Sequence, residues 1–427
     1  MNAALFEQSR GILGIAVLLA IAWGFSEDRG ARPGWRWIAG ALTLQGALAL
    51  LIVRVPFVWT AMGYANAAVA AIERATLEGS SYMFGYLGGA PLPFDLKEGV
   101  APPVVIAFQI LPLVIVFSAL AALFWHWGVL RAAVNGLSFL LRRTLGVSGV
   151  VGLSGGANLF LGVVESPLVV RAYFARMSRA ELFQVMVLAM ATISGAILIL
   201  YATTLSATVP DAVGHMISAS LVSLPAALLV AKLMVPGTPG EEATAADANE
   251  PGLKYESSID AVVKGTMDGM QLFLAVVAVI IVVFALVSLA DQALSLLPAV
   301  GDEPLTLKRL FGWLFAPLMW LIGVPWAEAQ AAGALMGTKA ILNEYVAYLE
   351  LAALPEDTLG ERGLLIVTYA LCGVANLASV GLLVSTIGTL CPERRSEAAG
   401  LGMRSWIAGN LASAMTGAWI GLVTVVG

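Results

Sequence analysis

Long apolar runs set the main constraint on how this chain can fold. A helix needs roughly 20 apolar residues to cross the ~30 Å hydrocarbon core of a bilayer. Eight runs are candidates for such helices, at residues 11–25, 37–54, 103–125, 184–204, 217–235, 270–294, 363–386 and 405–426. Charged residues make up only 12% of the 427 positions, against about 25% in soluble domains. The chain is therefore predicted to be an all-α integral membrane protein.

Two further apolar stretches, residues 149–170 and 310–351, are interrupted by Gly, Pro or charged residues. Short loops rich in Lys and Arg stay on the cytoplasmic side of a membrane. Loops of that composition lie at residues 26–36, 126–148, 171–180 and 387–404. These basic loops alternate along the chain with neutral or acidic loops only if each interrupted stretch enters and leaves the membrane on the same side. The sequence thus predicts eight transmembrane helices, two opposed re-entrant hairpins, and both termini on the outer, periplasmic side.

The order of these segments indicates an internal repeat. In each half of the chain one hairpin precedes two spans, so residues 149–236 and 310–427 form two units of inverted topology. A linker of soluble composition, residues 237–254, separates the halves. Three amphipathic segments are predicted to be interfacial helices, at residues 57–79, 131–145 and 256–269.

Each unit places a carboxylate in its hairpin and a polar, Gly-rich break in the following span. The carboxylates are Glu165 in LGVVESP and Glu344 in ILNEYVAY, and the breaks are MATISGA (190–196) and CGVANLASVG (372–381). A charged side chain at membrane depth costs at least about 2.5–3.5 kcal/mol, and unpaired backbone groups are also costly there. We therefore expect these groups to face a watered cavity or to hold an ion where the repeats meet.

Simpler roles for the same polar residues stay open. Each hairpin carboxylate can pair with a nearby cation, Arg171 or Lys339. Asn158 and Asn376 can be ordinary interhelical hydrogen-bonding residues. The matching positions of these groups in two repeats favour a functional site over those alternatives.

Other function classes find little support in the sequence. The net charge of −5 argues against a nucleic-acid partner. Two cysteines are too few for a disulfide framework or a metal site, and no HExxH, phosphate-loop or dinucleotide motif is present. Asp268 and Asp291 have no matching partner for intramembrane proteolysis. We therefore predict that the protein is not an enzyme and uses no organic cofactor.

Two long stretches resemble the concentrative nucleoside transporter family. They are GVPWAEAQAAGALMGTKAILNEYVAYLEL (323–351) and YALCGVANLASVGLL (369–383), and the resemblance extends from FQILP (108–112) to the end of the chain. It implies a homotrimer in the cell inner membrane. It also implies ion-coupled import of nucleosides by an elevator-like motion, with sodium or a proton as the coupling ion.

The resemblance also implies a division into a scaffold and a mobile transport domain. Residues 1–148 would supply scaffold and interfacial helices. Residues 237–309 would supply a cytoplasmic linker, an interfacial helix and a scaffold span. The transport domain would combine the two repeats, 149–236 and 310–427.

The site residues that the resemblance implies fall into two groups. The ribose hydroxyls would be held by Glu344, Asn376 and Ser379. This is chemically sensible because an ionised carboxylate can accept two charge-assisted hydrogen bonds from a cis-diol. Carbonyl and side-chain oxygens suit a hard cation, and the sodium site would be formed by Asn158, Leu161, Thr192 and Ile193.

The base end of the site departs from the family pattern. Typical members have Gly-Gln-Thr-Glu where this chain has Gly162-Val163-Val164-Glu165, and an aromatic residue where it has Val374. The base pocket would be lined by Val163, Val164, Glu165, Ile197 and Val374, which makes it apolar and roomy. The substrate can be a broad range of nucleosides, a modified nucleoside or another ribosyl compound. A carrier for a different polar metabolite on the same scaffold, and proton coupling through Glu165, are the alternatives.

Overall fold

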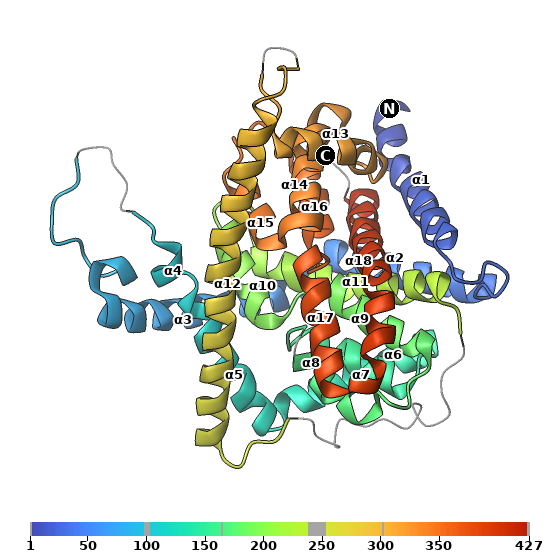
Figure 1. Cartoon of the computed structure of the whole chain (residues 1–427), viewed down its shortest axis with the longest axis horizontal. Coiled ribbons are helices and arrows are strands. Elements are labelled where there is room, and N and C mark those ends of the chain that lie inside the picture. The colour runs from blue at the N-terminus through green and yellow to red at the C-terminus, as the bar shows by residue number, and fades with distance from the viewer. Residues whose placement is uncertain (1, 98–102, 164, 238–252, 301–302, 425–427) are drawn as a thin grey trace.

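The computed structural model describes residues 2–97, 103–163, 165–237, 253–300 and 303–424 (Figure 1). Within these residues every regular element is a helix, and the β-type pairing is limited to an isolated bridge between Val300 and Glu303. Among the described residues, six helices are long and apolar enough to cross a membrane, or seven if one bent pair is a single span. The all-α membrane class is confirmed, and the count of eight spans stays a prediction.

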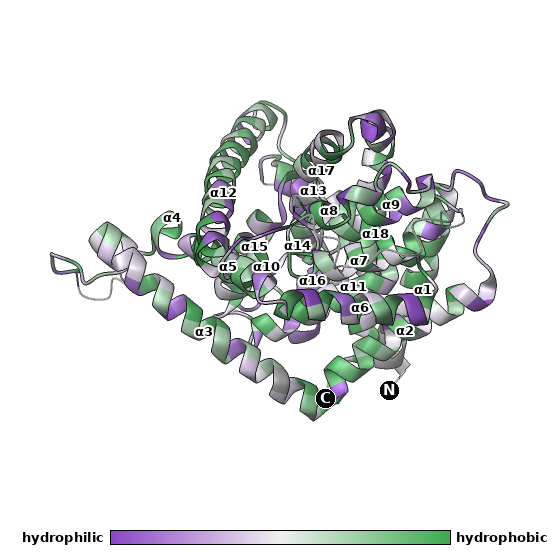
Figure 2. Cartoon of the chain, turned by 90° about the horizontal axis from the view of Figure 1, so that it is seen from below, coloured by the Kyte–Doolittle hydropathy of each residue, from purple (hydrophilic) through white to green (hydrophobic). Residues whose placement is uncertain are grey.

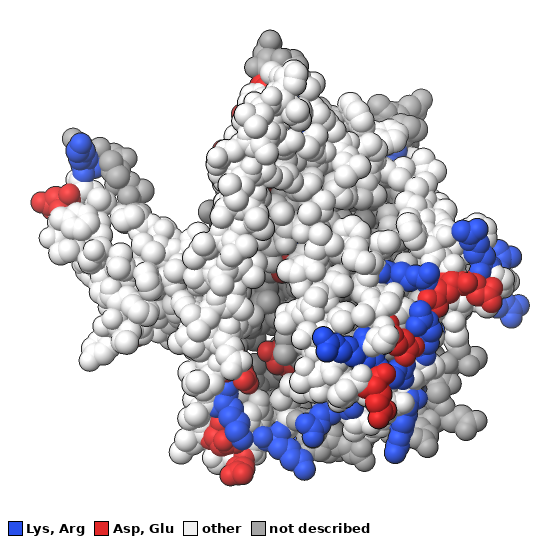
Figure 3. All heavy atoms as spheres, viewed as in Figure 1, with Lys and Arg blue, Asp and Glu red and all other residues white. Residues whose placement is uncertain are grey.

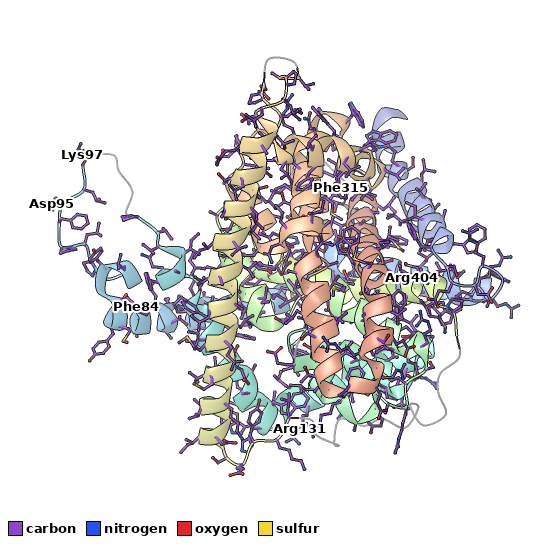
Figure 4. The ribbon with its side chains drawn as sticks, viewed as in Figure 1. Phe84, Asp95, Lys97, Arg131, Phe315 and Arg404 are labelled. Carbon is purple, nitrogen blue, oxygen red and sulfur yellow. The ribbon has the colours of Figure 1, made fainter. Side chains whose placement is uncertain are left out.

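The first part of the chain forms outer helices and a projecting arm. It comprises α1 (Asn2–Gly24), α2 (Trp35–Arg54), α3 (Pro56–Phe84), η1 (Gly85–Gly88), α4 (Ile106–Gln109) and α5 (Pro112–His126). α1 and α2 pack against α11 (Ala212–Met234) and α18 (Arg395–Val423). α3 runs along one edge and carries the arm beyond the body (Figures 1 and 2). The labelled Phe84, Asp95 and Lys97 lie on this arm in Figure 4.

Apart from α12 (Ser258–Leu294), the remaining helices occur in the same order in both halves. The first series is α6 (Val129–Leu145), α7 (Gly149–Asn158), α8 (Glu165–Val169), η2 (Arg171–Tyr173), α9 (Arg179–Ala191), α10 (Gly195–Leu205) and α11. The second is α13 (Leu307–Leu321), α14 (Trp326–Gly337), η4 (Thr338–Leu342), α15 (Glu344–Ala352), α16 (Glu361–Leu371), α17 (Leu377–Leu390), η5 (Pro392–Arg394) and α18. In both, two short helical arms precede an interrupted helix and a long helix. This parallel order is what a repeat requires, while its inverted topology stays a prediction.

The stretch 310–351, predicted as one hairpin, contains a separate helix and then the hairpin. α13 ends at Leu321, and the chain bends by 118° before α14. The bend is possible because Gly323 has φ 117°, a conformation that side chains disfavour, and Pro325 precedes the first residue of α14. In the order of helices, α14 to α15 stand where α7 and α8 stand in the first series, and α13 stands where α6 stands. That these segments are re-entrant hairpins of an inverted repeat stays a prediction.

α12 (Ser258–Leu294) is one continuous helix, although the sequence predicted an interfacial segment up to residue 269 and a separate span from 270. The glycines near that boundary serve close packing. A Cβ on Gly265 would lie 2.7 Å from Ala122 Cβ, and one on Gly269 would lie 2.7 Å from Ile115 Cα. Both neighbours are on α5, so the two glycines let α12 and α5 approach closely, as small residues do between membrane helices.

The buried centre and the outer surface differ in their helices. α9 and α10 are almost wholly buried, whereas few residues of α12 are buried and the rest are half-buried or exposed. Figure 2 shows that this exposed helix is predominantly hydrophobic. A helix that is apolar on its exposed face suits contact with lipid. The first break lies between the buried helices α9 and α10, whereas α17, which follows the second break, is mostly half-buried or exposed.

Basic side chains gather over one part of the surface. They lie at the lower and right-hand parts of Figure 3, where Figure 4 labels Arg131 and Arg404. In this region Glu27, between α1 and α2, pairs with Arg179 at 2.6 Å and also with Arg404. The Arg179 guanidinium holds the pKa of Glu27 below its usual range. The clustering agrees with a cytoplasmic location for these loops, which stays a prediction.

The close approach of α12 and α5 can be tested at Gly269. Gly269→Ala should lower the apparent thermal unfolding midpoint in detergent, because the added methyl overpacks the contact at a cost of about 1–3 kcal/mol. Gly400→Ala is the control: a Cβ there meets no atom within 4 Å, so the better helix propensity of Ala should leave the midpoint equal or higher. Equal shifts of both variants in the same direction would contradict the packing role.

Candidate functional site

Glu344 occupies the first position of α15, directly after the turn of the second hairpin. Asn343 is extended and caps the helix, because its Oδ1 accepts a hydrogen bond from Tyr345 N at 2.8 Å. The preceding π-helical turn, η4, delivers the chain to this cap. Glu344 is only 4% exposed. A carboxylate so deeply placed requires partners, since an unpaired buried charge is strongly unfavourable.

The two oxygens of Glu344 are bonded by residues from two different interrupted helices. Tyr201 Oη on α10 donates to Oε1 at 2.6 Å, and Asn376 Nδ2 donates to Oε2 at 2.6 Å. Asn376 also caps α17, because its Oδ1 accepts from Ser379 N at 2.8 Å. The structure therefore brings Glu344 and Asn376 together as predicted and links Ser379 to them through its backbone. α10, α15 and the start of α17 meet near the middle of Figure 1.

Lys339 is fully buried in the π-helical turn and is held by α18. Its Nζ donates to Asn410 Oδ1 at 2.9 Å and to Ser413 Oγ at 2.7 Å. Among the described residues it forms no ion pair with Glu344, whose oxygens are bonded by Tyr201 and Asn376. The simple pairing of Glu344 with Lys339 is thus not the arrangement seen, and Lys339 fastens the hairpin turn to α18.

α18 holds the second break as well as the hairpin. Asn410 Nδ2 donates to Ala375 O at 2.9 Å, and Trp406 Nε1 donates to Ala340 O at 2.7 Å. Backbone carbonyls freed by an interrupted helix need such donors inside an apolar bundle. The tip of the hairpin and the break beside it are therefore fixed by one helix.

The first hairpin forms a second polar group. Asn158, at the end of α7, donates from Nδ2 to Leu188 O at 3.0 Å and contacts Thr192 Oγ1. Ser166 Oγ donates to Asn158 Oδ1 at 2.8 Å. Asn158 and Thr192 thus meet as predicted, and Ser166 is a neighbour that the sequence analysis missed. A serine directly after Glu165 was the available signal.

This first group suits a hard cation in its chemistry. It supplies amide, hydroxyl and carbonyl oxygens in a buried place, and Leu161 and Ile193 contribute backbone outside the helices beside it. Among the described residues no group of three or more His, Cys, Asp or Glu could hold a metal ion. Oxygen-only donors fit sodium better than a transition metal.

The two groups are brought together because the two breaks touch. Gly373 has φ 150°, and a Cβ there would lie 3.1 Å from both Met190 O and Ala191 O. A Cβ on Gly409 of α18 would likewise meet Met190 and Ala375. The interrupted helices therefore abut at their breaks, with glycines at the points of closest approach.

The predicted base end is more apolar, and part of it lies outside the described residues. Val164 is in that undescribed part. Val163 and Ile197 are half-buried and Val374 is buried. Glu165 begins α8 and turns back over Gly162, where a Cβ would lie 2.3 Å from its Oε2. Among the described residues Glu165 forms no ion pair with Arg171.

Acidic side chains are visible within a recess between α12 and α17 in Figure 3. The recess lies on the face where α8 and α17 approach each other.

Tyr201 is the other residue that the sequence analysis missed. Its position four residues after Ile197 on α10 places both on one helix face, which was the only signal for it.

Family comparisons cover most of the chain. It matches the Na⁺ dependent nucleoside transporter N-terminus over residues 13–87, nucleoside recognition over 107–208, and the Na⁺ dependent nucleoside transporter C-terminus over 215–421. These matches confirm the family resemblance drawn from residues 323–351 and 369–383.

Relatives match along almost the whole length of this chain. An uncharacterized transporter of Haemophilus influenzae is 36% identical over 422 residues, which cover 97% of this chain and 98% of the relative. Nucleoside permease NupC of Helicobacter pylori is 31% identical, with 98% of both chains covered. Sodium/nucleoside cotransporter 1 of Rattus norvegicus is 29% identical, with 98% of this chain and 64% of the relative covered.

Solved structures of one transporter, CNTnw, show the same fold. Its inward-facing substrate-bound state has a TM-score of 0.85 at 36% identity and covers 97% of this chain and 99% of that one. A doubly substituted form in an outward-facing state has a TM-score of 0.85 at 34% identity, with 97% of each chain covered.

The role of Lys339 in fastening the hairpin predicts a stability effect. Lys339→Met should lower the free energy of unfolding by about 1–3 kcal/mol, because Asn410 and Ser413 lose a buried partner. Lys308→Met is the control, since that side chain is 48% exposed and pairs with Glu350 at 3.4 Å; such a pair contributes about 0–1 kcal/mol. Thermal unfolding of both variants checks this, and equal destabilisation would contradict it.

Proposed function

The chain belongs to the Na⁺-dependent nucleoside transporter family, and from this premise we propose that it imports nucleosides across the cell inner membrane together with sodium. Its relatives are transporters and permeases, so the chain is a transporter rather than an enzyme. The observation that supports the substrate class best is the buried Glu344 carboxylate, held by Asn376 at the start of α17.

The ribose is the part of the substrate that this site suits. A carboxylate has about four acceptor positions, and the two described donors use one on each oxygen. Two positions are left for the 2′ and 3′ hydroxyls of a riboside, which would donate in charge-assisted bonds. Asn376 and Ser379 would complete the sugar end of the site.

The base would be read weakly. Val163, Val164, Ile197 and Val374 cannot donate or accept hydrogen bonds from their side chains, so shape and burial would decide the choice of base. An apolar pocket separates similar groups by only about 1–3 kcal/mol. This favours a broad range of nucleosides, with a modified nucleoside or another ribosyl compound as the alternative substrate.

Sodium would be held by Asn158, Thr192 and the backbone of Leu161 and Ile193. When bound, the ion would supply a positive charge between the first hairpin and the break before α10. The hydrogen bond between Ser166 and Asn158 already links α8 to α7, the two arms of the hairpin. The bond from Asn158 to Leu188 O links the hairpin to α9. These contacts would place the hairpin for nucleoside binding. Proton coupling through Glu165 is the alternative.

The transport motion would carry the two repeats relative to the rest of the protein. In this proposal residues 149–236 and 310–427 form the moving domain, and residues 1–148 and 237–309 form the scaffold of a homotrimer. The inward-facing and outward-facing structures of CNTnw support two states for this fold. Lipid would contact the exposed apolar face of α12.

Glu344 provides the test of the substrate class. Glu344→Gln keeps the shape of the side chain but removes its charge, so ribonucleoside affinity should fall roughly 5- to 150-fold, or about 1–3 kcal/mol. A 2′,3′-dideoxynucleoside should bind the wild type weakly and be little affected by the substitution. Binding to purified protein measures both. Glu350→Gln, on the same helix, should leave both affinities unchanged, and equal losses for both ligands in Glu344→Gln would exclude the ribose role.

The coupling ion can be identified in proteoliposomes. A sodium gradient at fixed pH should drive uptake, and Asn158→Ala should weaken it. Asn66→Ala on α3 should not, because Asn66 donates to Asp211 and not to the proposed sodium site. By thermodynamic reciprocity, nucleoside should also raise the affinity for sodium. Uptake driven by a pH gradient alone and unchanged in Asn158→Ala would falsify the sodium assignment and move coupling to Glu165.

A further inference from the structure

Tyr201 joins the two halves of the protein at the carboxylate of the proposed ribose site. It lies on α10 of the first series, and its partner Glu344 lies on α15 of the second. The Oη–Oε1 distance is 2.6 Å, and the two residues are 2% and 4% exposed. A phenol bonded to an ionised carboxylate at this length is a strong, charge-assisted donor.

The ring of Tyr201 packs against α15, the helix that begins at Glu344. It stacks on the ring of Tyr345, with centroids 5.5 Å apart and an interplanar angle of 12°. The centroid of the Tyr348 ring lies 4.9 Å from that of Tyr201. Tyr348 Oη donates to Thr368 O at 3.0 Å and so does not compete for Glu344. The hydroxyl of Tyr201 is therefore fixed in direction by packing on α15.

Each carboxylate oxygen of Glu344 thus accepts a hydrogen bond from a different half of the chain. Asn376 holds Oε2 from the second interrupted helix, and Tyr201 holds Oε1 from the first. With either donor removed, the carboxylate group could turn about the bond that remains. Its free acceptor positions would then no longer be held at the spacing of a cis-diol, and affinity depends on such preorganisation.

We propose that Tyr201 is a positioning residue that orients Glu344 for the 2′ and 3′ hydroxyls and thereby sets the preference for ribosides over dideoxyribosides. This rests on the proposed function of Glu344 in binding ribose. Ile197, one turn earlier on the same face of α10, is assigned to the base end. One helix of the first repeat would therefore position both ends of the substrate.

Tyr201→Phe tests the proposal because it keeps the stacked ring and removes only the hydroxyl. Ribonucleoside affinity should fall about tenfold, as for a hydrogen bond to a charged group. The affinity for the matching 2′,3′-dideoxynucleoside should change less than about threefold, on the same scale. In the Glu344→Gln background the tenfold effect on the ribonucleoside should largely disappear, because the two residues act as a unit.

Tyr369→Phe is the matched control. Tyr369 is also a buried tyrosine, 1% exposed, and its Oη bonds His215 Nδ1 at 3.0 Å, away from Glu344. This variant should keep the wild-type ratio of ribonucleoside to dideoxynucleoside affinity. Thermal unfolding of each variant shows whether it is folded, and the affinity ratio separates positioning from a general loss of stability.

Two results would overturn the proposal, and they are distinguishable. If the wild type prefers ribonucleosides and Tyr201→Phe keeps that ratio, the role of Tyr201 is wrong while Glu344 retains its own. If the wild type binds ribo- and dideoxynucleosides equally, the ribose role of Glu344 fails, and the role of Tyr201 fails with it.

Discussion

Gly373 packs directly on the carbonyl oxygens of Met190 and Ala191, at the point where two interrupted helices abut. Breaks in membrane helices free backbone groups, and these are tolerated only inside protein or beside a polar cavity. The contact buries both breaks together. As a consequence, the Asn158–Thr192 group and the Glu344–Asn376 group come from neighbouring breaks, and both lie inside an otherwise apolar bundle.

The polar side chains of this region form a connected set rather than isolated charges. Asn376 both caps α17 and donates to Glu344. Lys339 donates hydrogen bonds to Asn410 and Ser413 of α18. A buried charge is tolerated when its partners are present, and removal of one partner is costly. The arrangement explains why a hairpin turn can hold an acidic and a basic residue five positions apart without a direct ion pair.

The sequence predicted the parts of the site where polarity is anomalous. Glu344, Asn376 and Asn158 stand out because each is expensive in an apolar stretch, whereas Thr192 was assigned through the family resemblance. The structure brings Glu344 to Asn376 and Asn158 to Thr192, and the functions of these residues stay predictions. Tyr201 could not be predicted in this way, because a tyrosine in an apolar helix is ordinary core. Pattern alone also does not separate glycines that break a helix from glycines that pack it. Gly323 allows the 118° bend, whereas Gly265 and Gly269 lie within the continuous α12.

The most direct test of the account is an experimental structure of the protein with a ribonucleoside and sodium. If Glu344 binds the ribose, the 2′ and 3′ oxygens lie within hydrogen-bonding distance, about 2.5–3.0 Å, of its carboxylate. Tyr201 and Asn376 should still bond its two oxygens, and the base should lie against Val163, Ile197 and Val374. A nucleoside whose sugar faces away from Glu344, or that binds outside the space between the two breaks, would contradict the account.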